Sequence, residues 1–170
     1  MEIRIKSKKR LKPEIYPVLH NIRSLYNVGA IFRTAEGLGV KKIYLTGYTP
    51  EPHDIFGKLR KDFAKTALGA EKYIEWEKLR YIAVLIKRLK KDGFQIVAME
   101  QSKKSVNLGK FRPRKSIALI LGNEVRGVPK PILQKCDKII EIPMRGKKES
   151  LNVSVAAGIA LYELINKFGD

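Results

Sequence analysis

The chain has only one cysteine, Cys136, and two histidines, His20 and His53. One cysteine cannot form an intrachain disulfide, which argues against a small secreted domain held together by disulfide bonds. Cys136 has no partner at CxxC spacing, and we interpret it as a small core residue. Neither histidine has a second ligand at metal spacing, so the sequence predicts no metal site.

Long apolar segments and the common nucleotide-binding loops are also absent. No run approaches the ~18 apolar residues of a membrane span, and the basic N-terminus has no apolar segment typical of a signal peptide. We therefore expect a cytoplasmic protein that does not enter a membrane. The glycine-containing corners match neither GxxxxGK[ST] nor GxGxxG, which argues against NTPases and dinucleotide enzymes. No Ser-His-Asp or Cys-His grouping stands out.

Acidic residues are scarce relative to basic ones. Seventeen Asp and Glu face 35 Lys and Arg, for a net charge of +18. A surface with this excess attracts polyanions, and we interpret it as a sign of a nucleic-acid partner. The alternative is a lysine-rich surface adapted to high temperature, but such surfaces usually gain glutamate together with lysine.

The length of 170 residues and the hydrophobic content of 44% fit one globular domain. We expect a basic arm over residues 1–15 and a single domain over residues 16–170. The arm is either a frayed, solvated terminus or a segment that grips RNA.

Apolar segments with strand and helix patterns alternate along the rest of the chain. Continuous apolar runs predict strands, and a largely parallel sheet with helices on both faces is the fold that such alternation favours. The predicted strands are 42–46, 73–76, 94–99, 117–121 and 138–142; the predicted helices are 27–39, 78–91 and 153–168; and residues 54–68 are expected to form a short helix or a mobile loop. The last helix is apolar around most of its circumference, which indicates a buried element or a homodimer interface.

Three segments carry the functional signal. They are NIRSLYNVGAIFRTAEGLGV at 21–40, IALILGNEVRGVPK at 117–130, and IEIPMRGKKESLNVSVAAGIALYEL at 140–164. The third reads as a strand, a polar loop and a helix N-terminus, an arrangement that binds ligands in α/β proteins. Taken in this order, the three segments resemble motifs one to three of the SpoU family of SPOUT RNA 2′-O-ribose methyltransferases.

This resemblance implies a SPOUT fold with a deep C-terminal trefoil knot, which would be an exception to the general absence of knots. It also implies a homodimer and S-adenosylmethionine (AdoMet) as the methyl donor, bound inside the knot. The residues that would hold the donor are Met99, Gly122, Ile142, Met144 and Leu151. The alternative reading of the four apolar residues in this set is ordinary core packing.

The resemblance also implies a catalytic set of Arg33, Asn27, Glu124, Ser150 and Asn152, with Arg33 contributed by the partner subunit to a shared active site. Because a guanidinium stays protonated at neutral pH, we expect Arg33 to act as a fixed cation rather than as a base. Glu124 would orient Arg33 or Asn27. The alternative readings are an exposed Arg33, an exposed Glu124 and an Asn152 that only caps its helix.

The leading interpretation is therefore an AdoMet-dependent enzyme that methylates a ribose 2′-hydroxyl of structured RNA, with tRNA favoured over ribosomal RNA. A non-catalytic RNA-binding protein of the same fold is the second reading, but all five catalytic candidates are retained. A base methyltransferase of another SPOUT branch is the third. The basic segment at 54–65 is a candidate for the element that determines which RNA is modified.

Overall fold

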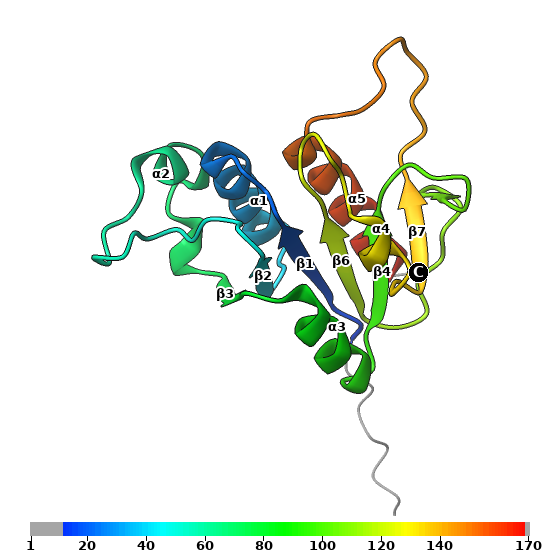
Figure 1. The fold of residues 1–170 in the computed structure, drawn as a ribbon, viewed down its shortest axis with the longest axis horizontal. Coiled ribbons are helices and arrows are strands. Elements are labelled where there is room, and N and C mark those ends of the chain that lie inside the picture. Colours follow the sequence, from blue (N-terminus) through cyan, green and yellow to red (C-terminus); the bar gives the residue numbers. More distant parts are fainter. Residues whose placement is uncertain (1–11, 169–170) are drawn as a thin grey trace, which may run out of the picture.

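The structure is a computed structural model that describes residues 12–168 (Figure 1). Its strands are β1 Ile15–His20, β2 Lys42–Thr46, β3 Glu75–Leu79, β4 Gln95–Met99, β5 Val106–Asn107, β6 Ile117–Leu121 and β7 Lys138–Glu141. Its helices are α1 Leu25–Gly37, α2 Lys61–Ala67, α3 Ile82–Lys91, α4 Lys130–Leu133 and α5 Val153–Lys167, with a 3₁₀ turn, η1, at Ala70–Lys72.

The strands form one seven-stranded sheet in the order β3-β2-β1-β6-β4-β7-β5. Each neighbouring pair is parallel, so the carboxyl ends of the strands meet at one edge. From β1 the chain runs outward through β2 to β3, and it then continues on the other side of β6. The reversal of strand order beside β1 and β6 is the kind of place where open α/β sheets bind ligands. The predicted α/β class with a parallel sheet is confirmed.

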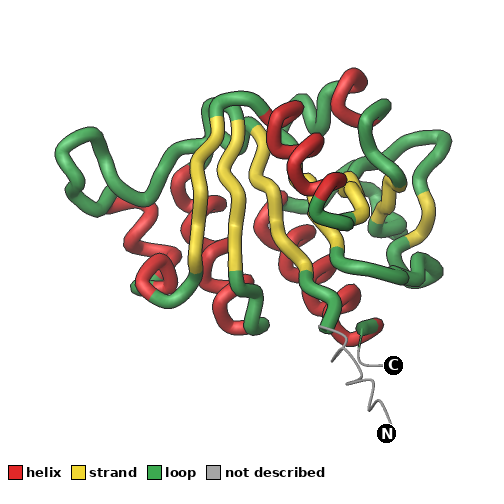
Figure 2. The backbone as a smooth tube through the Cα atoms, turned by 90° about the horizontal axis from the view of Figure 1, so that it is seen from below, coloured by secondary structure: helices red, strands yellow, loops and turns green. Residues whose placement is uncertain are grey.

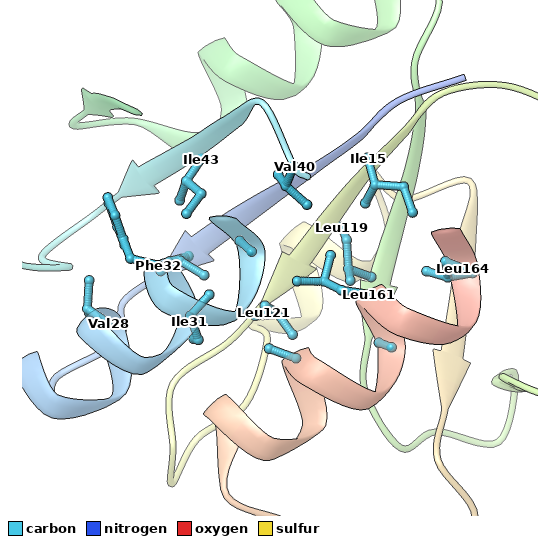
Figure 3. Close-up of a cluster of buried hydrophobic side chains, with 14 of the residues drawn as sticks. Ile15, Val28, Ile31, Phe32, Val40, Ile43, Leu119, Leu121, Leu161 and Leu164 are labelled. Atoms are coloured by element: carbon cyan, nitrogen blue, oxygen red, sulfur yellow. The ribbon is translucent and has the colours of Figure 1, made fainter. Parts of the chain in front are cut away.

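Helices cover both faces of the sheet, as Figure 2 shows. On one face, α1, α2 and α5 pack over alternate strand residues; Figure 3 shows part of this core around Phe32, Leu119 and Leu161. On the other face, α3 packs over the remaining strand residues, including Ile96 and Ile120. Because successive strand residues point to opposite faces, continuously apolar strands are required to fill both cores.

The structure contains elements that were not predicted, namely β1, β5 and α4, and the boundary between β3 and α3 differs from the prediction. No strand was expected over Ile15–His20, yet β1 lies in the middle of the sheet between β2 and β6. The predicted strand at 73–76 is β3 at 75–79, and the predicted helix at 78–91 begins only at Ile82. Lys78 belongs to β3, where its ammonium donates hydrogen bonds to the carbonyl oxygens of Gly47 and Thr49.

Several expectations remain predictions. The knot and the homodimer are not tested by this single chain, and residues 1–11 of the expected basic arm lie outside the described residues. Within residues 12–168, no helix combines the length and the apolar character needed to cross a bilayer. Cys136 is partly buried, and its thiol donates to the carbonyl oxygen of Ile132 at 3.2 Å, as expected of a packed structural cysteine.

Candidate active site

A cavity of about 790 Å³ lies at the carboxyl edge of the sheet. The carboxyl ends of β4, β6 and β7 open into it, and the loop that leads from β7 to α5 forms another wall. This loop is the orange segment that projects from the ribbon in Figure 1. All five residues predicted to hold the methyl donor line the cavity: Met99, Gly122, Ile142, Met144 and Leu151.

Gly122 makes a backbone contact that no other residue could make. A Cβ atom at this position would lie 2.5 Å from the carbonyl carbon of Gly127 and 2.6 Å from the amide nitrogen of Val128. The corner therefore closes a tight turn of the chain on itself beneath the cavity. A glycine is therefore required here by the neighbouring backbone, whether or not a ligand also approaches it.

Asn123 organises the turn that follows. Its backbone N–H and C=O pair with Gly127, and its side-chain oxygen accepts hydrogen bonds from the amides of Val125 and Arg126 at 2.9 and 2.8 Å. Its side-chain amide donates to the carbonyl oxygen of Asn21 at 3.0 Å. This buried asparagine was not among the predicted site residues, although an asparagine beside a glycine corner is a recognisable turn signal.

Glu124 joins this turn to the start of α1. One carboxylate oxygen accepts from the amide of Arg23, and the other accepts from the amide of Ser24 and the side-chain nitrogen of Asn27, each at 3.1 Å. Burial by itself raises the pKa of Glu124, but the hydrogen bonds outweigh burial and hold this pKa below its ordinary value. The carboxylate is therefore charged at neutral pH.

The polar chain continues from α1 to α5. The side-chain oxygen of Asn27 accepts from the side-chain nitrogen of Asn152 at 3.2 Å. Asn152 caps α5, with its side-chain oxygen accepting from the backbone amide and the hydroxyl of Ser154 at 2.8 and 2.6 Å. Donors and acceptors alternate along this series of hydrogen bonds from Glu124 to Ser154, so the orientation of each side-chain amide is determined. The structure thus brings Asn27, Glu124 and Asn152 together.

The other two predicted catalytic residues, Ser150 and Arg33, lie outside this series of hydrogen bonds. Ser150 is exposed in the loop before α5 and lines the cavity. Arg33 is exposed on α1 and does not line the cavity. Its guanidinium makes no hydrogen bond or ion pair with any other residue in the 12–168 range. One subunit by itself does not bring Arg33 to the donor site.

Two further residues shape the cavity and were not predicted. Glu100 accepts a hydrogen bond from the amide of Val128 at 2.9 Å, which fixes the turn after β6. Gln101 donates from its side chain to the carbonyl oxygen of Glu149 at 2.6 Å, which ties the loop before α5 to the end of β4. A signal existed, because both residues directly follow a predicted strand and must lie at its carboxyl end.

The expectation that the protein has no metal site stays a prediction. No group of three or more His, Cys, Asp or Glu side chains among residues 12–168 is arranged to hold a metal ion. His20 is buried, and its ring pairs with the hydroxyl of Thr46 at 2.9 Å. Burial, together with the nearby charge of Lys78, lowers the pKa of His20 below its ordinary value.

Comparison with known proteins places these features in a family. Over 143 residues the chain is 41% identical to a tRNA (guanosine(18)-2′-O)-methyltransferase of Aquifex aeolicus, covering 84% of this chain and 64% of the relative. The crystal structure of the A. aeolicus TrmH/SpoU tRNA modifying enzyme superposes with a TM-score of 0.78 at 36% identity, covering 94% of this chain and 77% of that one.

An AdoMet-bound rRNA methyltransferase from Sinorhizobium meliloti superposes with a TM-score of 0.79 at 27% identity, covering 90% of this chain and 56% of that one. The match to the A. aeolicus tRNA methyltransferase covers 64% of that relative, so the chain spans less than two thirds of its length. Residues 14–162 match the SpoU rRNA Methylase family, a range that includes the first two sequence motifs and all but the last two residues of the third. The chain belongs to the SpoU rRNA methylase family.

Proposed function

We propose that this chain is an AdoMet-dependent methyltransferase that modifies a ribose 2′-hydroxyl of structured RNA, with tRNA as the favoured substrate. The observation that carries the proposal is the cavity at the carboxyl edge of the sheet, which is lined by every residue predicted to hold the donor. The Glu124–Asn27–Asn152 chain lies beside it. A related enzyme is named for 2′-O-methylation of a tRNA guanosine.

The residues that line the cavity suit AdoMet. A volume of about 790 Å³ is in the range of small-molecule sites, about 300–1,000 Å³. Ile142, Met144 and Leu151 provide apolar surface for an adenine, and the lining contains both acidic and basic side chains, which suits a ligand that carries an ammonium, a sulfonium and a carboxylate. When bound, AdoMet would supply a methyl group already activated by its positive sulfur.

The contribution of the protein is then to position the ribose and to stabilise charge. The weak point of the reaction is the 2′-hydroxyl, a poor nucleophile at neutral pH. We assign Arg33 the role of a fixed cation that holds the RNA phosphate and stabilises the developing alkoxide, while the proton of the hydroxyl is released to solvent water. Glu124 keeps Asn27 oriented toward the site, and alignment of the reacting groups supplies much of the remaining acceleration.

Arg33 can serve this role only if a second subunit brings it to the cavity. Helix α5 carries an exposed apolar stripe of Val155, Ile159 and Tyr162, with exposed fractions of 51, 43 and 60%. The stripe lies on a helix that packs beside α1, the helix of Arg33. We therefore propose a homodimer formed through α5 and α1, in which each active site takes Arg33 from its partner.

The remaining expectations fit this proposal. The net charge of +18 supplies attraction to RNA, and the segment at 54–65 presents lysines and an arginine next to an exposed Ile55–Phe56 tip. The C-terminal trefoil knot and a cytoplasmic location remain part of the proposal. They follow from the family resemblance and from the place where tRNA is processed.

A test of the function uses labelled AdoMet with total tRNA and, separately, ribosomal RNA, followed by mapping of ribose methylation. We expect transfer to tRNA at a 2′-oxygen. Transfer to ribosomal RNA alone would favour the rRNA alternative, and methylation of a base would favour another SPOUT activity. RNA binding without any transfer would identify a non-catalytic RNA-binding protein.

A further inference from the structure

A second cavity, of about 560 Å³, lies on the other side of the turn that bounds the donor cavity. It is formed where β1, β2 and β6 end, at the point where the strand order reverses. Its walls are Arg23, Tyr48, Pro50, Asn123, Val125 and Arg126. None of these side chains is acidic.

The two cavities share one wall. Asn123, Val125 and Arg126 line both of them, so the turn stabilised by Asn123 separates the donor cavity from its neighbour. Glu124 lies in the same turn, and its carboxylate is held by the backbone amide of Arg23, a residue of the second cavity. A strand of RNA that places a ribose beside Glu124 therefore passes close to this second cavity.

The side chains of the second cavity suit a nucleotide. Tyr48 is 57% exposed, yet its hydroxyl accepts a hydrogen bond from the side-chain nitrogen of Asn123 at 2.9 Å, so an exposed aromatic residue is held in place. Exposed aromatic faces of this kind stack with bases. The residue that holds this hydroxyl, Asn123, is itself buried.

Two guanidiniums complete the site. Arg23 and Arg126 are exposed, and across the described part of the chain their side chains have no hydrogen-bond or ion-pair partner. Their backbones, by contrast, are anchored by N–H donation to Glu124 and to the side chain of Asn123. Fixed backbones carrying two free guanidiniums, with no acidic neighbour in the cavity, are suited to bind a phosphate.

We infer that this second cavity is a nucleotide subsite, which binds one nucleotide of the RNA strand next to the methylated one, with its base on Tyr48 and its phosphate between Arg23 and Arg126. The inference rests on the proposed function for the position of the RNA. The pocket itself would select RNA strands that can turn a base outward at this point, since a paired base cannot reach the ring.

The experiment compares tRNA binding and crosslinking in four variants. Tyr48→Ala removes the ring, Tyr48→Phe keeps it, and Arg23→Gln removes one guanidinium that does not line the donor cavity. Tyr73→Ala is a matched control, because Tyr73 is 79% exposed and precedes β3, at the opposite edge of the sheet. The probe is a tRNA transcript pool containing 4-thiouridine, used for binding titrations and photocrosslinking.

We expect Tyr48→Ala to weaken tRNA binding about tenfold, whereas Tyr48→Phe and Tyr73→Ala should bind like the native protein. Arg23→Gln should lower the salt dependence of binding by about one phosphate contact. AdoMet affinity, measured by calorimetry, should not change in any of these variants. The native protein should crosslink at Tyr48.

Binding by Tyr48→Ala equal to that of Tyr73→Ala, or crosslinks only outside the second cavity, would overturn the subsite. The proposed function fails in a different way, because a native protein that crosslinks at Tyr48 but transfers no methyl group would retain the subsite as an RNA-binding site and lose the enzyme.

Discussion

The side-chain amide of Asn27 donates a hydrogen bond to the carboxylate of Glu124, 97 residues further along the chain, at 3.1 Å. This bond ties the first motif to the second, and the bond from Asn152 to Asn27 adds the third. Three segments that are far apart in the sequence therefore meet in one polar chain beside the cavity. The spacing of the motifs along the chain cannot show this, because it depends on the parallel sheet that aligns their strand ends.

Replacing Glu124 with Gln should weaken this junction. Two carboxylate oxygens accept three hydrogen bonds here, and an amide would present N–H donors to the donors of Arg23, Ser24 or Asn27. We expect a loss of about 1–2 kcal/mol in the free energy of unfolding, together with a fall in turnover because Asn27 loses its orientation. Denaturant unfolding and methyl-transfer kinetics measure the two effects. Unchanged stability would show that the bonds to Glu124 contribute nothing.

The same carboxylate predicts a pH dependence. Because folding holds the pKa of Glu124 below its ordinary value of 4.5, its contribution to stability is complete above that value and disappears as the pH falls through the lower, folded-state pKa. The difference in unfolding free energy between native protein and Glu124→Gln should thus be constant near neutral pH and shrink in acid. A difference that grew toward acid would mean that the carboxylate is destabilised by folding.

Substitutions of Arg33 test whether this residue acts only through its positive charge. The alternatives are that it acts as a base or that it needs the planar geometry of the guanidinium. If charge alone is needed, Arg33→Lys should retain substantial turnover, whereas Arg33→Ala should lose about 100-fold or more. Both variants should keep normal AdoMet affinity and stability, because Arg33 is exposed and does not line the donor cavity. Steady-state kinetics on tRNA measure this. A loss of turnover in Arg33→Lys as complete as in Arg33→Ala would contradict a role that depends on charge alone.

The shared active site can be tested by mixing subunits. A chain with Arg33→Ala keeps its donor cavity, and a chain with Gly122→Ala keeps its Arg33. Each should be inactive alone, but a mixed dimer should regain one complete site, roughly half the native activity per mixed dimer. Co-expression with two affinity tags isolates the mixed species. If the mixed dimer is as inactive as its parents, Arg33 does not act across the interface.

The elements that could be predicted from the sequence are those with a clear local pattern of apolar residues. The strands β4 and β6 were predicted from continuous apolar runs. The five residues expected to hold the donor line one cavity because each ends or follows a strand of the sheet or precedes α5. The strand β1 was missed, since Pro17 at its centre cannot donate to a ladder and normally argues against a central strand. Here Pro17 lies opposite Leu119 of β6 within the parallel ladder.

The start of α3 and the hydrogen-bond partners of Asn123 and Glu100 escaped prediction for a different reason. Lys78 and Leu79 continue the helical apolar pattern, yet the pairing of Lys78 with Leu45 extends β3 and delays the helix to Ile82. Asn123 and Glu100 act through backbone amides that only the folded turn brings near. Such contacts are tertiary, so local patterns leave them unseen.

The central claim is that the cavity lined by Gly122 binds AdoMet, and titration calorimetry tests it most directly. A Cβ on Gly122 would collide with the Gly127–Val128 backbone, whereas a Cβ on Gly37 has no atom within 4 Å. We expect the native protein and Gly37→Ala to bind AdoMet at one site per chain, and Gly122→Ala to lose at least about tenfold in affinity, or about 1.4 kcal/mol. No heat of AdoMet binding to the folded native protein, with or without tRNA, would contradict the account.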